Sequence, residues 1–318
     1  MLEIYKDLLN SCREMLRRNP NDASALASQH IIYNNIFDIN TIWFDNFLIE
    51  EENILYLQRH LYLFNLVEEI GKRKLFPDYT NGRYEKLSKK DLLELVHDFF
   101  KNSTNEEFYE IFLRMIRNKE ITLYKNKKDD FDAFTFYWPH IDKVITVIHC
   151  NNYKTGSDFV YVPIIAHEVG HGIDAIINFH IASQQENAIY SEIVSTFFEL
   201  ICNYYFYDTV YMEDAISYAY EFYNDIIQKA RLLSSYKAYE NPIENPIIFF
   251  PYIVAFNIAV ELFIIYLNDK DKAFYLLKKL IEIPKFIPHE EYFKRILDLG
   301  IKPNNSLDKF ENVLKRML

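Results

Sequence analysis

The chain has 318 residues, half of them hydrophobic, and a formal net charge of −11 at pH 7. This length and apolar content suffice for one large domain or two smaller ones with a substantial core. The negative charge disfavours nucleic-acid binding, because phosphate contacts need a basic face. Only six glycines are present and no glycine-rich phosphate loop occurs, which argues against nucleotide-binding folds of that kind.

Cysteine usage and hydropathy indicate where the protein works. The three cysteines, Cys12, Cys150 and Cys202, are odd in number and far apart in the chain. A disulfide framework or a cysteine-based zinc site is therefore not expected, and a reducing, cytoplasmic setting fits. The N-terminus has acidic residues where a secretory signal has basic ones. Polar residues and a proline interrupt the apolar run 247–267, so we expect a buried helix there and no membrane span.

The predicted elements are mostly helical. Before the middle of the chain, apolar periodicity and capping residues predict helices over Leu2–Arg18, Asn40–Lys74, Lys89–Asn102 and Asn105–Asn118. Three short segments then predict strands at Ile121–Tyr124, Phe131–Trp138 and Val144–Cys150. The remaining helices are expected over Val160–Ile177, Asn187–Tyr207, Met212–Tyr239, Pro246–Asp269, Lys270–Ile283 and two terminal segments. The expected fold class is mainly α with a small β-sheet.

A domain boundary is expected near Glu120. It separates an N-terminal helical region, residues 1–119, from a second region, residues 120–318. We expect the two regions to pack together as one compact unit.

Residues 167–171 carry the H-E-x-x-H zinc-peptidase signature. Histidines four residues apart lie on one face of a helix, so His167 and His171 can reach the same metal ion. Glu168 lies about 100° round that helix, where it can take a proton from a metal-activated water. The surrounding helix is apolar on nearly every side, and a buried helix tolerates such residues only with a reason such as metal ligation. The alternative is a chance pattern of two unconnected histidines and a solvated glutamate.

The third ligand is expected on a later helix. Zinc peptidases with a third ligand six residues after the second histidine are disfavoured, because Ile177 stands there and Asp174 replaces their glycine. The helix predicted over Asn187–Tyr207 instead carries Glu192 and Glu199, two turns apart on one face. Glu192 is the candidate third ligand. Glu199 is the candidate outer partner, which accepts the free N–H of a ligand histidine and fixes its tautomer. A solvated acidic face is the alternative.

These motifs resemble those of the oligoendopeptidase F and thimet oligopeptidase family. Residues 166–172, AHEVGHG, match its H-E-x-G-H helix, and residues 190–199, YSEIVSTFFE, match its E-x-x-S-T-x-x-E helix. Residues 293–301 and 308–311 are similar to its closing helices. The resemblance implies a zincin-like metallopeptidase fold, one zinc ion, and a channel that admits short peptides. The chain is shorter than typical members, as expected of a compact relative.

The resemblance also implies groups that handle the substrate. A substrate-binding edge strand is expected before the motif helix, and the β-branched run 143–150 is the candidate. Family members stabilise the oxyanion with histidine and tyrosine near a C-terminal helix. The corresponding stretch, Pro246–Ala259, keeps Tyr252 but has no preceding histidine. Tyr252 is therefore the candidate oxyanion donor, with Tyr236 and Tyr239 as alternatives.

The expected function is a zinc-dependent endopeptidase that hydrolyses short oligopeptides with a metal-activated water. One Zn²⁺ would be held by His167, His171 and Glu192, with Glu168 as proton acceptor. Peptides are the expected partners, with no nucleic acid and no membrane. Two alternatives stay open. One is a regulatory metalloprotease that cleaves a single protein partner. The other is a catalytically silent zinc-binding relative, suggested by the reduced set of oxyanion groups.

Overall fold

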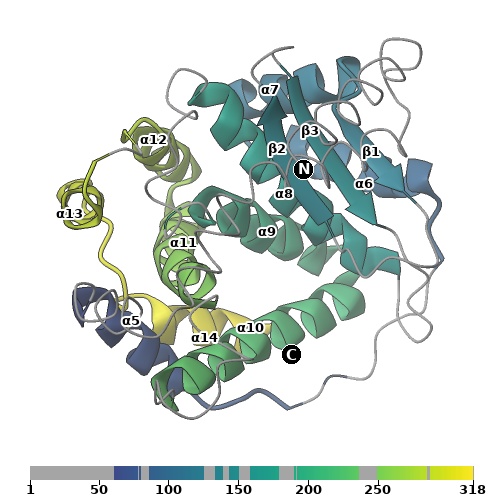
Figure 1. Cartoon of the computed structure of the whole chain (residues 1–318). Helices are drawn as coiled ribbons and strands as arrows, with labels where there is room; N and C mark the ends of the chain where they lie inside the picture. Colours follow the sequence, from purple (N-terminus) through teal and green to yellow (C-terminus); the bar gives the residue numbers. More distant parts are fainter. Residues whose placement is uncertain are drawn as a thin grey trace, which may run out of the picture.

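A computed structural model of the chain describes residues 61–77, 79, 86–124, 133–138, 143–149, 158–178, 190, 192–235, 249–284 and 287–317. These residues form a mainly helical structure with one small sheet, which confirms the predicted fold class (Figure 1). The helix expected over Leu2–Arg18, and the first part of the one expected over Asn40–Lys74, lie outside the described residues. The proposed boundary near Glu120 stays a prediction.

Among the described residues, three helices precede the sheet: α5 (Leu61–Gly71), α6 (Lys89–Ser103) and α7 (Glu106–Arg117). Short polar caps fix where α6 and α7 begin. The Ser88 hydroxyl accepts from the Asp91 amide, and the Asp91 carboxylate accepts from the Ser88 amide, which forms a capping box. The Asn105 side chain accepts from the Phe108 amide at the start of α7. Both helices pack on the helix that carries the H-E-x-x-H signature.

The sheet has three described strands, β1 (Ile121–Tyr124), β2 (Ala133–Trp138) and β3 (Lys143–His149), in the order β1-β3-β2. β3 pairs parallel to β1 and antiparallel to β2. The prediction that the run 143–150 forms a free edge is therefore wrong, because β3 is the central strand. Its residues 144–148 are all buried, as expected of a strand covered on both faces. β2 is the outer strand on the side of the signature helix.

In the described part of the chain, seven α-helices follow the sheet. Their bounds are α8 (Tyr161–Ile177), α9 (Ile193–Tyr205), α10 (Met212–Ser235), α11 (Phe250–Asn268), α12 (Lys270–Ile281), α13 (His289–Asp298) and α14 (Leu307–Arg316). α8 packs on β2 and β3 with one side and on α9 with another, and α9 packs on α11. Figure 1 shows this layering, with α8 and α9 between the sheet and the pair α10 and α11.

α8 and α9 approach unusually closely at one glycine. A Cβ atom on Gly170 would lie 2.7 Å from the Cα of Ser195 and 3.2 Å from the Cδ2 of Phe198. A side chain larger than hydrogen at position 170 would therefore push the α9 backbone away. The glycine inside the signature sets the spacing between the two helices that carry the candidate site.

Two of the described helices have the length and composition of membrane spans. They are the segment Asp158–Ile177, which contains α8, and Phe250–Asn268, which is α11. In both cases most of the apolar window, 61% and 67% respectively, is buried inside the fold. Both act here as core helices, as the sequence predicts for the apolar run 247–267.

Candidate active site

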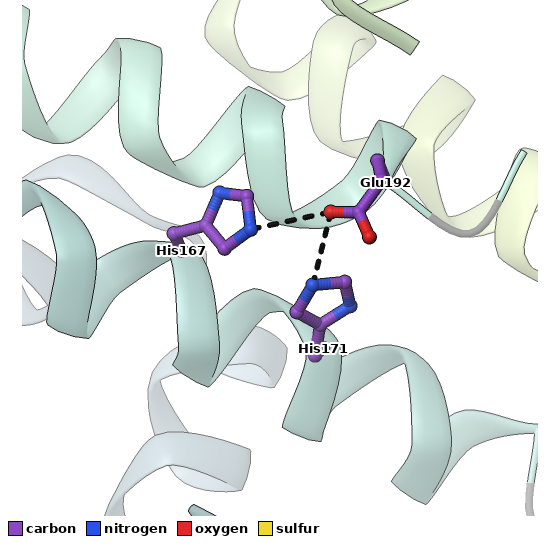
Figure 2. Close-up of side chains that lie close together, drawn as sticks. All are labelled: His167, His171 and Glu192. Atoms are coloured by element: carbon purple, nitrogen blue, oxygen red, sulfur yellow. Dashed lines mark ion pairs between the residues drawn. The ribbon is translucent and has the colours of Figure 1, made fainter. Parts of the chain in front are cut away.

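His167 and His171 project from the middle of α8 toward the same point. Their rings lie one turn apart on the helix, with ring centroids 5.0 Å from each other. The Nε2 atoms of His167 and His171 lie 3.2 Å and 3.1 Å from the same oxygen, Oε2 of Glu192. Figure 2 shows the carboxylate facing both rings. The structure thus brings the three predicted ligands together.

Glu192 occupies the turn directly before α9, so that α9 begins later than the helix expected over Asn187–Tyr207. Its carbonyl oxygen accepts the first bond of the helix, from the Thr196 amide at 3.0 Å. The Ser195 hydroxyl lies 3.0 Å from that carbonyl oxygen and 3.2 Å from Oε2. Ser195 can therefore steady the carboxylate. Residues 187–189 and 191 lie outside the described part of the chain.

The approach to Glu192 is anchored at Tyr190, which is buried. Its ring stacks on the ring of Tyr292 from α13, with centroids 4.4 Å apart and planes 12° apart. The Tyr190 hydroxyl donates to the carbonyl oxygen of His289 at 3.2 Å. Through these contacts the C-terminal part of the fold holds the backbone two residues before a candidate ligand.

The three ligand side chains fit a zinc ion. One ligand atom from each of His167, His171 and Glu192 lies within 4.8 Å of the other two. Two imidazole nitrogens and one carboxylate oxygen are ligands that zinc accepts, and three protein ligands leave a coordination position open for chemistry. The three side chains are partly buried, 14–22% exposed, so a bound cation would compensate for the solvent that these polar groups have lost.

Glu168 lies beside this cluster and does not contact Glu192 or the histidines through its Oε2 atom. The residue is 6% exposed, and its Oε2 atom has no hydrogen-bond partner among the described residues. Burial raises the pKa of the Glu168 carboxyl above its usual 4.5, although the two histidines oppose this. A buried carboxylate with a raised pKa and a free oxygen is suited to accept a proton near neutral pH.

The candidate ligands shift one another's pKa values. Burial, the largest single influence, lowers the pKa of each imidazole, but nearby carboxylates outweigh it. Glu199 and Glu192 hold the pKa of His167 well above 6.5, and Glu192 raises that of His171. Burial would raise the pKa of Glu192, yet His171 and His167 hold it well below 4.5. The metal-free site therefore favours protonated histidines against an ionised carboxylate.

Glu199 stands behind His167, as the spacing of the two glutamates predicts. Its Oε2 atom lies 2.6 Å from Nδ1 of His167, and its Oε1 atom accepts from the hydroxyl of Tyr218 on α10 at 2.5 Å. A carboxylate that accepts at Nδ1 leaves Nε2 of the same ring free for a metal. Sequence reasoning missed Tyr218, because no motif distinguishes it among the 25 tyrosines of the chain.

A threonine connects the outer strand to the signature helix. The Thr135 hydroxyl on β2 lies 3.0 Å from the carbonyl oxygen of Glu168 and 2.8 Å from the hydroxyl of Thr146 on β3. β2 is thereby attached to α8 at the residue that is the candidate proton acceptor. Sequence reasoning also missed this contact, because a single threonine in a strand carries no functional signal.

Tyr252 lies near the start of α11 and is 42% exposed. The carboxylate of Glu192, burial and the carboxylate of Glu168 all raise the pKa of its hydroxyl. Lys229 from α10 lies over the Tyr252 ring, 5.6 Å from its centroid. The alternative oxyanion donors Tyr236 and Tyr239 lie outside the described residues.

The chain has the fold of solved peptidase structures. A Bacillus anthracis str. Ames protein assigned as an oligoendopeptidase F aligns over 97% of this chain and 63% of its own, with a TM-score of 0.58 and 14% identity. PZ peptidase A, solved with an inhibitor, aligns over 98% and 70%, at 0.56 and 13%. A Chlamydophila abortus protein assigned as a peptidase aligns over 99% and 62%, at 0.52 and 16%.

The likeness to these structures concerns the fold, because the identities are low. The chain spans between 62% and 70% of the length of these three structures. No protein-family model and no curated protein sequence matches it. The similar structures agree with the fold that the motif resemblance predicts.

Proposed function

We propose that the chain is a zinc-dependent endopeptidase that hydrolyses short peptides. The observation that carries the proposal is the convergence of His167, His171 and Glu192 beside Glu168, whose buried Oε2 atom has no partner among the described residues. The fold shared with solved peptidases supports this reading of the cluster. Peptide substrates, zinc and a cytoplasmic location remain parts of the proposal.

The chain's own residues divide the chemistry among them. Zinc, when bound, would supply Lewis-acid polarisation of the scissile carbonyl and easier deprotonation of the attacking water. Glu168 would take the proton of that water on its free oxygen and pass it to the leaving amine nitrogen. The hydroxyl of Tyr252, a residue that is 42% exposed, would donate to the oxygen that becomes negative as the carbonyl is attacked.

The outer strand β2 is the proposed binding site for the substrate backbone. β2 pairs with β3 on one side only among the described strands, so its other edge can accept an extended peptide. Thr135 attaches this strand to the carbonyl of Glu168. A peptide added to β2 would thus run beside the proton acceptor. This role replaces the one first expected for the run 143–150.

The test is hydrolysis of a panel of short quenched peptides by the purified chain, with zinc content measured by mass spectrometry on the same sample. We expect about one zinc per chain and turnover of several unrelated peptides, abolished by a chelator and restored by added zinc. Turnover of no peptide together with cleavage of one protein would favour the regulatory metalloprotease. Bound zinc with no turnover of either kind would favour the silent relative.

A further inference from the structure

Glu199 makes two hydrogen bonds, one through each of its carboxylate oxygens. One of its oxygens accepts from Nδ1 of His167 at 2.6 Å, and the other accepts from the Tyr218 hydroxyl at 2.5 Å. Three helices thus contribute one residue each, His167 from α8, Glu199 from α9 and Tyr218 from α10. Glu199 is 5% exposed, so these two contacts replace the solvent that a surface carboxylate would have.

The ring of Tyr218 is itself held in place. It stacks on Phe222, one turn further along α10, with planes 8° apart and centroids 6.2 Å apart. Phe222 in turn meets the edge of Phe256 on α11. Burial, and then the carboxylate of Glu199, raise the pKa of the Tyr218 hydroxyl well above 10.0, so it stays protonated and acts as a donor.

We propose that Tyr218 is a positioning residue for the metal site, which acts on His167 through Glu199. This inference rests on the proposed zinc site and extends it by one residue that has no contact with the ligands' metal-facing atoms. The Tyr218 hydroxyl occupies one oxygen of Glu199 and leaves the other for His167. The carboxylate cannot then rotate away from Nδ1, and the imidazole presents Nε2 to the metal in a fixed orientation.

A cavity beside this pair gives the proposal a chemical test. Glu199 and Tyr218 line it together with Tyr204, Phe263, Phe310 and Leu314, and its volume is only about 20 Å³. Removing the Tyr218 side chain would enlarge this space by roughly the volume of one aromatic ring. Apolar cavities of that size take up small aromatic molecules.

The first experiment measures zinc affinity of the full chain by competition with a chelating indicator. Tyr218→Phe removes only the hydroxyl, and we expect zinc binding about 10-fold weaker, the low end of what outer partners of zinc ligands contribute. Tyr204→Phe is the matched control, because Tyr204 lines the same cavity, whereas the hydrogen bonds of Glu199 go to His167 and Tyr218. Equal zinc affinity in Tyr218→Phe and wild type would overturn the proposal.

A double-mutant cycle separates positioning from general packing. If Tyr218 acts through Glu199, then Tyr218→Phe added to Glu199→Ala causes no further loss of zinc affinity. A full 10-fold loss in both backgrounds would mean an independent effect of Tyr218 and would contradict the proposal.

The second experiment is chemical rescue. We expect Tyr218→Ala to bind zinc more weakly and to regain affinity when phenol is added, since phenol supplies the ring and the donor together. Toluene fills the same space without a donor, and equal rescue by toluene would show that packing alone is restored. The proposal is then wrong even though the zinc site exists.

The outcomes also separate this inference from the proposed function. A wild-type chain that binds no zinc contradicts the proposed function, and this inference with it. If wild type binds zinc and Tyr218→Phe binds it equally tightly, only this inference is contradicted.

Discussion

His167, a candidate metal ligand, and Tyr252, the candidate oxyanion donor, are supported in different ways. His167 is fixed from behind by Glu199 and Tyr218 through hydrogen bonds of 2.6 Å and 2.5 Å, all inside the helical core. Tyr252 is 42% exposed, and its described neighbour on the outer side is Lys229, whose amine lies over its ring. Both residues come from helices, yet only the first belongs to a network of buried polar groups.

Under the proposed function, this difference separates the residues that would bind the metal from those that would contact the substrate. Buried, fully bonded groups are pre-organised, so changes among them should alter metal affinity and the free energy of unfolding. An exposed tyrosine at the rim contributes little to the core, and changes there should alter the rate of the chemical step.

The largest effect is expected from Glu168→Gln, which keeps the shape of the side chain but cannot accept the proton. We expect kcat for peptide hydrolysis to fall by about 10²–10⁴-fold, the typical contribution of a general base. Zinc content, measured by mass spectrometry, should stay at the wild-type level. Undiminished hydrolysis by this variant would contradict the proposed mechanism.

Tyr252→Phe tests the candidate oxyanion donor. If the hydroxyl donates to the oxyanion, kcat falls by up to about 10²–10³-fold while zinc affinity and the melting temperature stay unchanged. Steady-state kinetics on one peptide give the result, and Tyr275→Phe, a change of a 60% exposed tyrosine on α12, is the control. A Tyr252→Phe enzyme with normal kcat would leave Tyr252 without a catalytic role.

Gly170→Ala tests the inner side through packing. The added Cβ would meet the Ser195 backbone at 2.7 Å, so α9 must move, together with the turn that holds Glu192. We expect a free energy of unfolding lower by about 1–3 kcal/mol, as for other overpacked cores, together with weaker zinc binding. Denaturant unfolding of the metal-free chain measures the first effect.

Gly172→Ala is the matched control for that substitution, two residues along the same helix. Its Cβ would meet the flexible end of the Met115 side chain, which can move aside more easily than backbone. The better helix propensity of alanine, about 1 kcal/mol over glycine, offsets part of the strain. Equal losses in the two variants would mean that the close approach of α9 is not what position 170 requires.

Tyr292→Leu tests whether α13 helps to place Glu192. The substitution removes the stack on Tyr190, and an aromatic pair contributes roughly 0.5–1.5 kcal/mol beyond its buried area. Zinc affinity should therefore fall about two- to ten-fold, whereas Tyr292→Phe, which keeps the ring, should retain it. A loss of melting temperature with unchanged zinc affinity would limit Tyr292 to a structural role.

The smallest effect concerns pH and the metal-free chain. The pKa values of His167 and His171 are raised above 6.5, so their pairing with carboxylates stabilises the fold below pH 6.5 and is lost as pH rises through the raised values. The melting temperature of the metal-free chain should therefore lose this contribution at higher pH. Zinc must displace the same protons, so its affinity should rise over that interval, and calorimetry in two buffers should detect proton release.

The helices and the residues that converge at the candidate site were accessible from the sequence because both depend on local spacing. Apolar residues at helical intervals mark α8 and α11, and the four-residue and seven-residue spacings place His167, His171, Glu192 and Glu199. Glu192 still proved to lie in the turn before α9, since the exact start of a helix depends on neighbouring contacts such as those of Ser195.

Features that depend on distant contacts could not be predicted in the same way. The central place of β3 is set by its pairing with both β1 and β2, which β-branched composition does not reveal. The contact of Tyr218 with Glu199 joins two helices through a hydroxyl that no motif marks. In each case the decisive partner lies elsewhere in the chain.

The hydrogen bond from Thr135 to the Glu168 carbonyl has a consequence for where a peptide would be cut. Side chains of a strand alternate between its two faces, so a slip of β2 by one residue would turn Thr135 away from α8 and break this bond. The bond therefore fixes the register of β2 relative to Glu168. A peptide paired with β2 would take its register from that strand. The Thr135 hydroxyl would therefore determine which amide bond of the peptide lies next to the proton acceptor.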